Sequence, residues 1–221
     1  MGSEKPTLSD YDRRRGDPGR MLTFTDGVIA IVITIMVLEL EAPDLSSGQS
    51  LAASLEDMRP TFVAFVVSFL LVGMYWVGHR DMFTGVRLIN RDVMWLNLLF
   101  LLPIALIPFV ASVIGEYPTE ATALHLYGAV LIVVTLMRML LYWYLLRHPG
   151  LLWEAPTRRS RRFALTMTAV PLIAYVAAML VADSLPGLSL ALYAASPVLY
   201  FILVTFLRSH SRTSSEAREF S

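Results

Sequence analysis

Six runs of mostly apolar residues follow one another along the chain, and each is about as long as the 20 residues that a helix needs to cross a bilayer. The runs are Met21–Leu40, Thr61–His79, Val93–Ile114, Ala121–Leu146, Phe163–Ala182 and Leu188–Leu207. Hydrophobic residues make up 56% and charged residues 16% of the sequence, whereas soluble domains average about 45–50% and about 25%. We therefore predict an all-α integral membrane protein with six transmembrane helices.

The basic residues alternate between the two ends of these predicted helices. Sixteen of the 18 Lys and Arg side chains precede the first span, follow the second, follow the fourth or follow the sixth, and only Arg59 lies in an opposite loop. Basic residues in short loops stay on the cytoplasmic side. The pattern predicts a multi-pass protein of the cell (plasma) membrane with both termini in the cytoplasm. The polar segments 1–19 and 209–221 are predicted to be disordered, which leaves 20–208 as one transmembrane domain.

The sequence holds no constellation typical of an enzyme. Cysteine is absent, the four histidines lie in different segments, and neither a Walker loop, a GxSxG elbow nor a GxGxxG motif occurs. We expect no catalytic residue, no bound cofactor and, with balanced charge, no nucleic-acid partner. A TVGYG carbonyl filter is also missing, so side chains would have to line any ion path.

The first span combines an acidic residue with an apolar stripe. Asp26 lies inside this span, where a carboxylate normally faces protein and is paired. His79 and Asn97 fall at a similar depth in the second and third spans, which predicts a buried polar cluster of Asp26, Thr25, His79 and Asn97, with Trp76 packing against it or donating from its indole.

A second face of the same span is aliphatic with one hydroxyl. Ile31 lies about 140° around the helix from Asp26, and Thr34, Ile35 and Leu38 lie within about 60° of Ile31. This stripe is compatible with a narrow pore. Two plainer interpretations stay open, since such a stripe can face lipid or pack, and the Thr34 hydroxyl can bond its own i−4 carbonyl at Ala30.

The segment from Arg20 to Glu39 resembles the first helix of the transmembrane protein 175 family, whose signature is Arg-x-x-x-Phe-Ser-Asp. Arg20, Phe24, Thr25 and Asp26 stand at the signature positions, with Thr25 in place of the usual serine. Further matches are Tyr75-Trp76 followed by His79, Asn97 with Phe100 and Leu101, Leu102-Pro103, and Pro108-Phe109. Gly27 replaces the more common alanine.

The resemblance implies a potassium channel, because the family comprises endosomal and lysosomal potassium channels in animals and single-repeat relatives in prokaryotes. It implies a homotetramer in the lipid bilayer, with a pore lined by the first helix of each subunit and passing monovalent cations. Arg20, Phe24, Thr25 and Asp26 would bind that helix to the second and third. By spacing from Asp26, the narrowest ring maps onto Ile31 and the selectivity threonine onto Thr34, so the K⁺ path runs near both, with modest selectivity over Na⁺.

Two other functions stay open. A secondary transporter would need ionisable groups at mid-membrane, and Arg138 is the one candidate at that depth. We expect Arg138 to extend toward the cytoplasm and assign it no function. A non-conducting membrane scaffold is the second alternative.

Overall fold

The computed structural model describes residues 16–43, 45, 48–154 and 157–219 of the chain. Nearly all of the regular secondary structure in these residues is helical. The α-helices are α2 (Gly19–Ile35), α3 (Leu51–Asp57), α4 (Arg59–Phe83), α5 (Arg91–Ala105), α6 (Ile107–Glu116), α7 (Ala121–Arg147), α8 (Arg158–Val181) and α9 (Pro186–Glu219). Two 3₁₀ turns, η1 (Met36–Glu39) and η3 (Pro149–Leu151), follow α2 and α7. The all-α class is thereby confirmed. Residues 1–15 of the N-terminal segment predicted to be disordered lie outside the described residues.

Four helical stretches in the described part of the chain are long and apolar enough to cross a membrane. They are Gly19–Glu39, Arg59–Phe83, Arg91–Glu116 and Ala121–Arg147, and they correspond to the first four predicted spans. Within the last two predicted spans the apolar helices are shorter, Val170–Val181 and Pro186–Ile202. That the fifth and sixth spans cross the membrane therefore stays a prediction.

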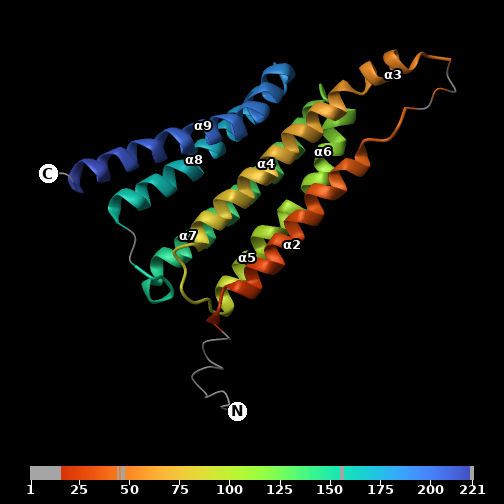
Figure 1. Cartoon of the computed structure of the whole chain (residues 1–221). Coiled ribbons are helices and arrows are strands. Elements are labelled where there is room, and N and C mark those ends of the chain that lie inside the picture. Colours follow the sequence, from red (N-terminus) through yellow and green to blue (C-terminus); the bar gives the residue numbers. More distant parts are fainter. Residues whose placement is uncertain (1–15, 44, 46–47, 155–156, 220–221) are drawn as a thin grey trace, which may run out of the picture.

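Successive passes of the chain run in alternating directions (Figure 1). The passes are α2, α4, α5 with α6, α7, α8 and α9. In Figure 1, α2, α4, α5 and α7 lie nearly parallel, while α8 and α9 form a hairpin beside them that packs on α7 and α4. We call the end where α2, α5 and α8 begin the basic end, because its connecting segments carry most of the arginines.

The third predicted span, Val93–Ile114, is made of two helices. Helix α5 ends at Ala105 and α6 begins at Ile107. Pro103 and Pro108 flank the break, and each lacks the N–H needed for an i→i−4 bond and crowds the preceding turn. The two pieces still make one pass, so the break bends this span without ending it.

The last helix also extends further than expected. The backbone of α9 is helical to Glu219, through residues 209–219 of the segment predicted to be disordered. Extending an existing helix adds one hydrogen bond per residue without a new nucleation step, which explains how a polar segment continues the helical backbone.

The basic end has a small core of its own. Met21, Phe83, Val86, Ile89, Val93, Leu141 and Leu145 form a buried cluster there. The α4–α5 connection pairs with the segment after α7, since Val86 and Leu152 form a β-bridge and Arg87 N–H donates to the Leu151 carbonyl over 2.8 Å. Ile89 N–H donates to the Gly16 carbonyl over 2.7 Å. The segment preceding α2 is thereby tied to the α4–α5 connection and, through it, to the segment after α7.

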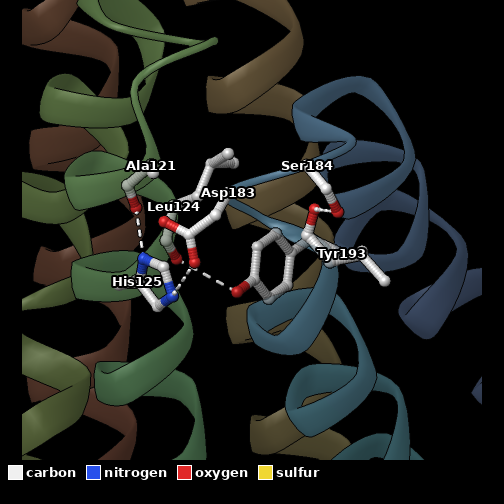
Figure 2. Close-up of polar contacts among 7 residues, drawn as sticks. Ala121, Leu124, His125, Asp183, Ser184 and Tyr193 are labelled. Atoms are coloured by element: carbon white, nitrogen blue, oxygen red, sulfur yellow. Dashed lines mark hydrogen bonds and ion pairs between the residues drawn. The ribbon is translucent and has the colours of Figure 1, made fainter.

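At the opposite end, α7 is tied to the connection between α8 and α9 (Figure 2). His125 Nε2 lies 3.6 Å from the Asp183 carboxylate, and its Nδ1 lies 2.7 Å from the Ala121 carbonyl. The Tyr193 hydroxyl donates to the Leu124 carbonyl over 3.0 Å. Close approach is possible here because residue 128 of α7 is a glycine, whose absent Cβ would meet Tyr193 and Met179.

Candidate pore helix and its polar anchor

Helix α2 has one buried and one exposed face. Met21, Thr25, Ile29, Val32 and Met36 are buried against the bundle. On the opposite side, Ile31 is 58% and Leu38 is 73% exposed, and Ile35 and Thr34 are exposed with them. The four residues predicted to line a pore therefore share a face that the rest of the chain leaves uncovered.

An open groove runs between this exposed face and α6. It has a volume of about 510 Å³ and is lined from α2 by Val28, Ile31, Val32 and Ile35, from η1 by Glu39, and from the third pass by Ala105, Pro108, Phe109 and Ser112. The walls of the groove are mostly aliphatic. The Glu39 carboxylate lies at one end of the groove, on the side of the bundle opposite the basic end.

Asn97 joins the buried face of α2 to α4. Its Nδ2 donates to Thr25 Oγ1 over 2.8 Å, and its Oδ1 lies 2.8 Å from Nε2 of His79. An amide oxygen only accepts, so Nε2 of His79 carries the hydrogen in this contact. The three side chains are almost fully buried. We name Thr25, Asn97 and His79 the polar anchor.

Aromatic packing fixes the His79 ring within the anchor. The ring stacks on Phe100 of α5 with centroids 5.2 Å apart and planes 7° apart. It also contacts Phe83 of its own helix, at 4.6 Å between centroids. Because the ring is held on two sides, Nε2 points at Asn97 without needing a charged partner.

Asp26 lies beside this anchor, where it accepts from Trp76 as expected and pairs with Arg80, which was not expected. Its Oδ1 accepts from Trp76 Nε1 over 2.8 Å, and its Oδ2 lies 3.5 Å from Arg80 Nη1. Its side chain is 37% exposed. The sequence predicted a single buried cluster, whereas the structure has two adjacent groups: the buried anchor, and Asp26 with Trp76 and Arg80 at the edge of the α2–α4 contact.

Arg80 is the member of this site that sequence reasoning missed. Among the described residues, the ion pair with Asp26 and a position over the Trp76 ring, 5.8 Å from its centroid, hold its guanidinium. The signal was present in the sequence, because Arg80 follows Trp76 by four residues and so lies one turn away on the same helical face.

Thr34 adopts the plainer alternative left open by its sequence. Its hydroxyl lies 3.0 Å from the Ala30 carbonyl and 2.9 Å from the Ile31 carbonyl. One hydroxyl carries one hydrogen, which is donated to the backbone. The oxygen remains on the exposed face of α2, where its lone pairs are available to an ion or to water.

Two residues of the family signature, Phe24 and Arg20, lie exposed on α2. Phe24 is 53% exposed, and Arg20 is exposed and forms no ion pair within the described part of the chain. Their binding of α2 to the neighbouring helices stays a prediction.

Arg138 departs from expectation: it is 5% exposed, inside the bundle, rather than extended toward water.

These features define an α-helical, multi-pass membrane protein in which one helix is anchored on one face and left free on the other. The described residues hold no cluster of three or more His, Cys, Asp or Glu side chains that could bind a metal ion. This arrangement suits a pore-lining helix that acts through oxygens and aliphatic side chains.

Comparison with known proteins identifies the family. Residues 20–108 match the family described as "Endosomal/lysosomal potassium channel TMEM175". A potassium channel of Streptomyces collinus is 36% identical over 74% of this chain and 85% of that protein. A potassium channel of Chryseobacterium is 38% identical over 60% of this chain and 67% of that protein. The chain belongs to the TMEM175 family, which is a family of ion channels and not of enzymes.

A solved structure shows the same fold. The crystal structure of a potassium-selective TMEM175 homologue from Chamaesiphon minutus superposes with a TM-score of 0.74, covering 83% of this chain and 96% of the other at 22% identity. At that identity the likeness bears on the fold alone. It supports the bundle described above.

Proposed function

We propose that four copies of this chain assemble into a potassium channel of the plasma membrane, with α2 of each copy lining the central pore and both termini in the cytoplasm. The observation that carries the proposal is the exposed face of α2, which around Ile31 and Ile35 is apolar except for the Thr34 hydroxyl and lies opposite a face anchored by hydrogen bonds. Relatives that are potassium channels support the choice of ion.

The proposed selectivity comes from a dry ring at Ile31. A cation passing an aliphatic ring sheds part of its hydration shell, and K⁺ holds that shell less tightly than Na⁺ because it is larger. The barrier is lower for K⁺, and selectivity is modest because no carbonyl cage replaces the lost water. The Thr34 oxygen, whose hydrogen is donated to the backbone, supplies partial compensation three residues beyond the ring.

Bi-ionic reversal potentials in liposomes test both residues. Thr34→Ala is expected to lower the potassium to sodium permeability ratio, and Ile31→Asn is expected to wet the ring and raise Na⁺ leak. Thr23→Ala is the matched control, since Thr23 bonds the Gly19 carbonyl in the same way but lies 11 residues, about 16 Å, nearer the amino end of α2. If the potassium to sodium permeability ratio is unchanged in Thr34→Ala, Thr34 has no part in selectivity. If permeation is unchanged in Ile31→Asn, the constriction does not lie at Ile31.

Assembly and transport class need separate measurements. Light scattering of the purified protein should give four chains per particle, because a monomer has no central axis for an α2-lined pore. Single-channel recording should give unitary ohmic currents. Slow saturable flux would favour a transporter instead, and the absence of both would favour a scaffold.

A further inference from the structure

Arg138 is a buried cation that the channel mechanism does not use. Its side chain lies within α7, nine residues and about 13 Å from Arg147 at the basic end. It is 5% exposed, and within the described part of the chain its Nε and Nη2 have no hydrogen-bond partner. The guanidinium lies over the Tyr75 ring, 5.8 Å from the centroid, which compensates only part of its charge.

No carboxylate lies in the apolar spans around Arg138, and the acid nearest to Gly78 along α4 is Asp81, three residues and about 4.5 Å further on. No Asp or Glu occurs in residues 60–80, 93–115, 121–153, 155–182 or 184–215. Asp26, the one acid within α2 (Gly19–Ile35), has its oxygens on Trp76 and Arg80. A lone charge inside a membrane protein is costly and is normally paired. Because Nε and Nη2 of Arg138 have no partner in the described part of the chain, a counter-ion from outside the chain would complete the pairing.

The fold makes room for the guanidinium at one point of α4. A Cβ on Gly78 would lie 2.5 Å from Arg138 Nη1 and 3.1 Å from the Tyr200 hydroxyl. The guanidinium of α7 and the hydroxyl of α9 thus converge on the same spot beside a residue without a side chain. Guanidinium nitrogens only donate, so the group that completes this cluster is an acceptor carrying negative charge.

We propose that Arg138, with Tyr200 as a second donor, binds a singly charged anion inside each subunit. Free chloride or phosphate and the phosphodiester of a phospholipid share this chemistry. Arg147 and the exposed Arg158 and Arg161 of the basic end give the approach a positive potential that favours anions. The site is separate from the α2 face, so it stands or falls independently of the permeation pathway.

Thermal unfolding of the purified full-length protein, followed by its tryptophan fluorescence, tests the free-anion source. Potassium gluconate is replaced by potassium chloride at constant K⁺ concentration. Above the dissociation constant, the melting temperature is expected to rise by about 3 to 5 °C for each tenfold increase in chloride. Arg138→Met is expected to abolish the rise, and Tyr200→Phe is expected to shift its midpoint to higher chloride. Arg59→Met, which changes an exposed arginine at the end of the bundle away from the basic end, is expected to leave the rise intact.

Phosphate analysis of the same samples tests the lipid source. Phospholipid that stays with the wild-type protein through extensive detergent exchange, and is lost from Arg138→Met, assigns the site to a lipid phosphate even without a chloride effect. If Arg138→Met does not fold, Arg138→Lys keeps the charge without the planar donor fork and should weaken either readout severalfold. No chloride effect and no retained phospholipid in the wild type, or an effect that persists in Arg138→Met, would overturn the proposal.

Discussion

The hydrogen bond between Thr25 and Asn97 gives a quantitative test of how α2 is held. Thr25→Val keeps the shape of the side chain but removes the oxygen that accepts from Asn97 Nδ2. Asn97→Leu removes that donor and also the acceptor of His79. Both positions are about 1% exposed or less, so water does not replace the missing partners.

The expected loss in the free energy of unfolding depends on how many buried polar groups each substitution leaves without a hydrogen-bond partner. Thr25→Val orphans one buried amide hydrogen, which costs about 1 to 3 kcal/mol. Asn97→Leu leaves two groups unsatisfied and is expected to cost about 2 to 6 kcal/mol by the same reasoning. In the double variant the Thr25–Asn97 pair is absent on both sides, so the combined loss should fall short of the sum. Interhelical hydrogen bonds in membranes average about 0.6 and reach about 1.7 kcal/mol, which sets the expected coupling energy.

Equilibrium unfolding in mixed detergent and SDS micelles, applied to all four proteins of the cycle, measures that coupling. Thr25→Ser is the matched control, because it keeps the hydroxyl and loses one buried methyl, at about 1 kcal/mol. Paired with Asn97→Leu it should show a coupling energy near zero, because serine and threonine both accept from Asn97. Strictly additive losses, with a coupling energy of zero within error, would refute the idea that this bond anchors α2.

Three further changes follow from the same contacts. Trp76→Phe removes the indole donor to Asp26 and is expected to lower unfolding stability by about 0.5 to 1.7 kcal/mol. Arg80→Gln, which breaks an ion pair with both partners more than one third exposed, should change it by no more than about 1 kcal/mol, and a larger loss would mean that the pair is buried in the assembly. Gly128→Ala places a Cβ against Met179 and Tyr193 and should cost about 1 to 3 kcal/mol, whereas Gly73→Ala, with nothing within 4 Å, should not.

The two faces of α2 could be predicted because helical periodicity depends on sequence alone. The burial of Thr25, Ile29 and Val32 and the exposure of Ile31, Ile35 and Leu38 follow the expected 100° per residue. The meeting of Thr25, His79 and Asn97 was predictable for a related reason, since each polar group lies at a similar depth in an apolar span. Depth and face together left few partners for each group.

The partners of Asp26 could not be fixed by depth alone. Asp26, Trp76 and Arg80 meet at the edge of the α2–α4 contact, and which side chain reaches an edge depends on the rotation of α4 about its axis. The hydrophobic pattern of α4 is too uniform to define that rotation. The position of Arg138 was missed for a similar reason, because only packing shows that Gly78 of α4 opens a space for its guanidinium.

The polar groups fix the rotation of α2 near its amino end, and apolar packing must carry that orientation to the constriction. Ile31 and Thr34 lie five and eight residues beyond Asp26, about 8 and 12 Å along the helix. Over that distance the described contacts of the buried face are apolar, through Ile29, Val32 and Met36. Apolar contacts resist separation of the helices more than they resist rotation, because dispersion has little directionality. A loss of the polar anchor should therefore change ion selectivity at Ile31 and Thr34 before it detaches α2 from the bundle.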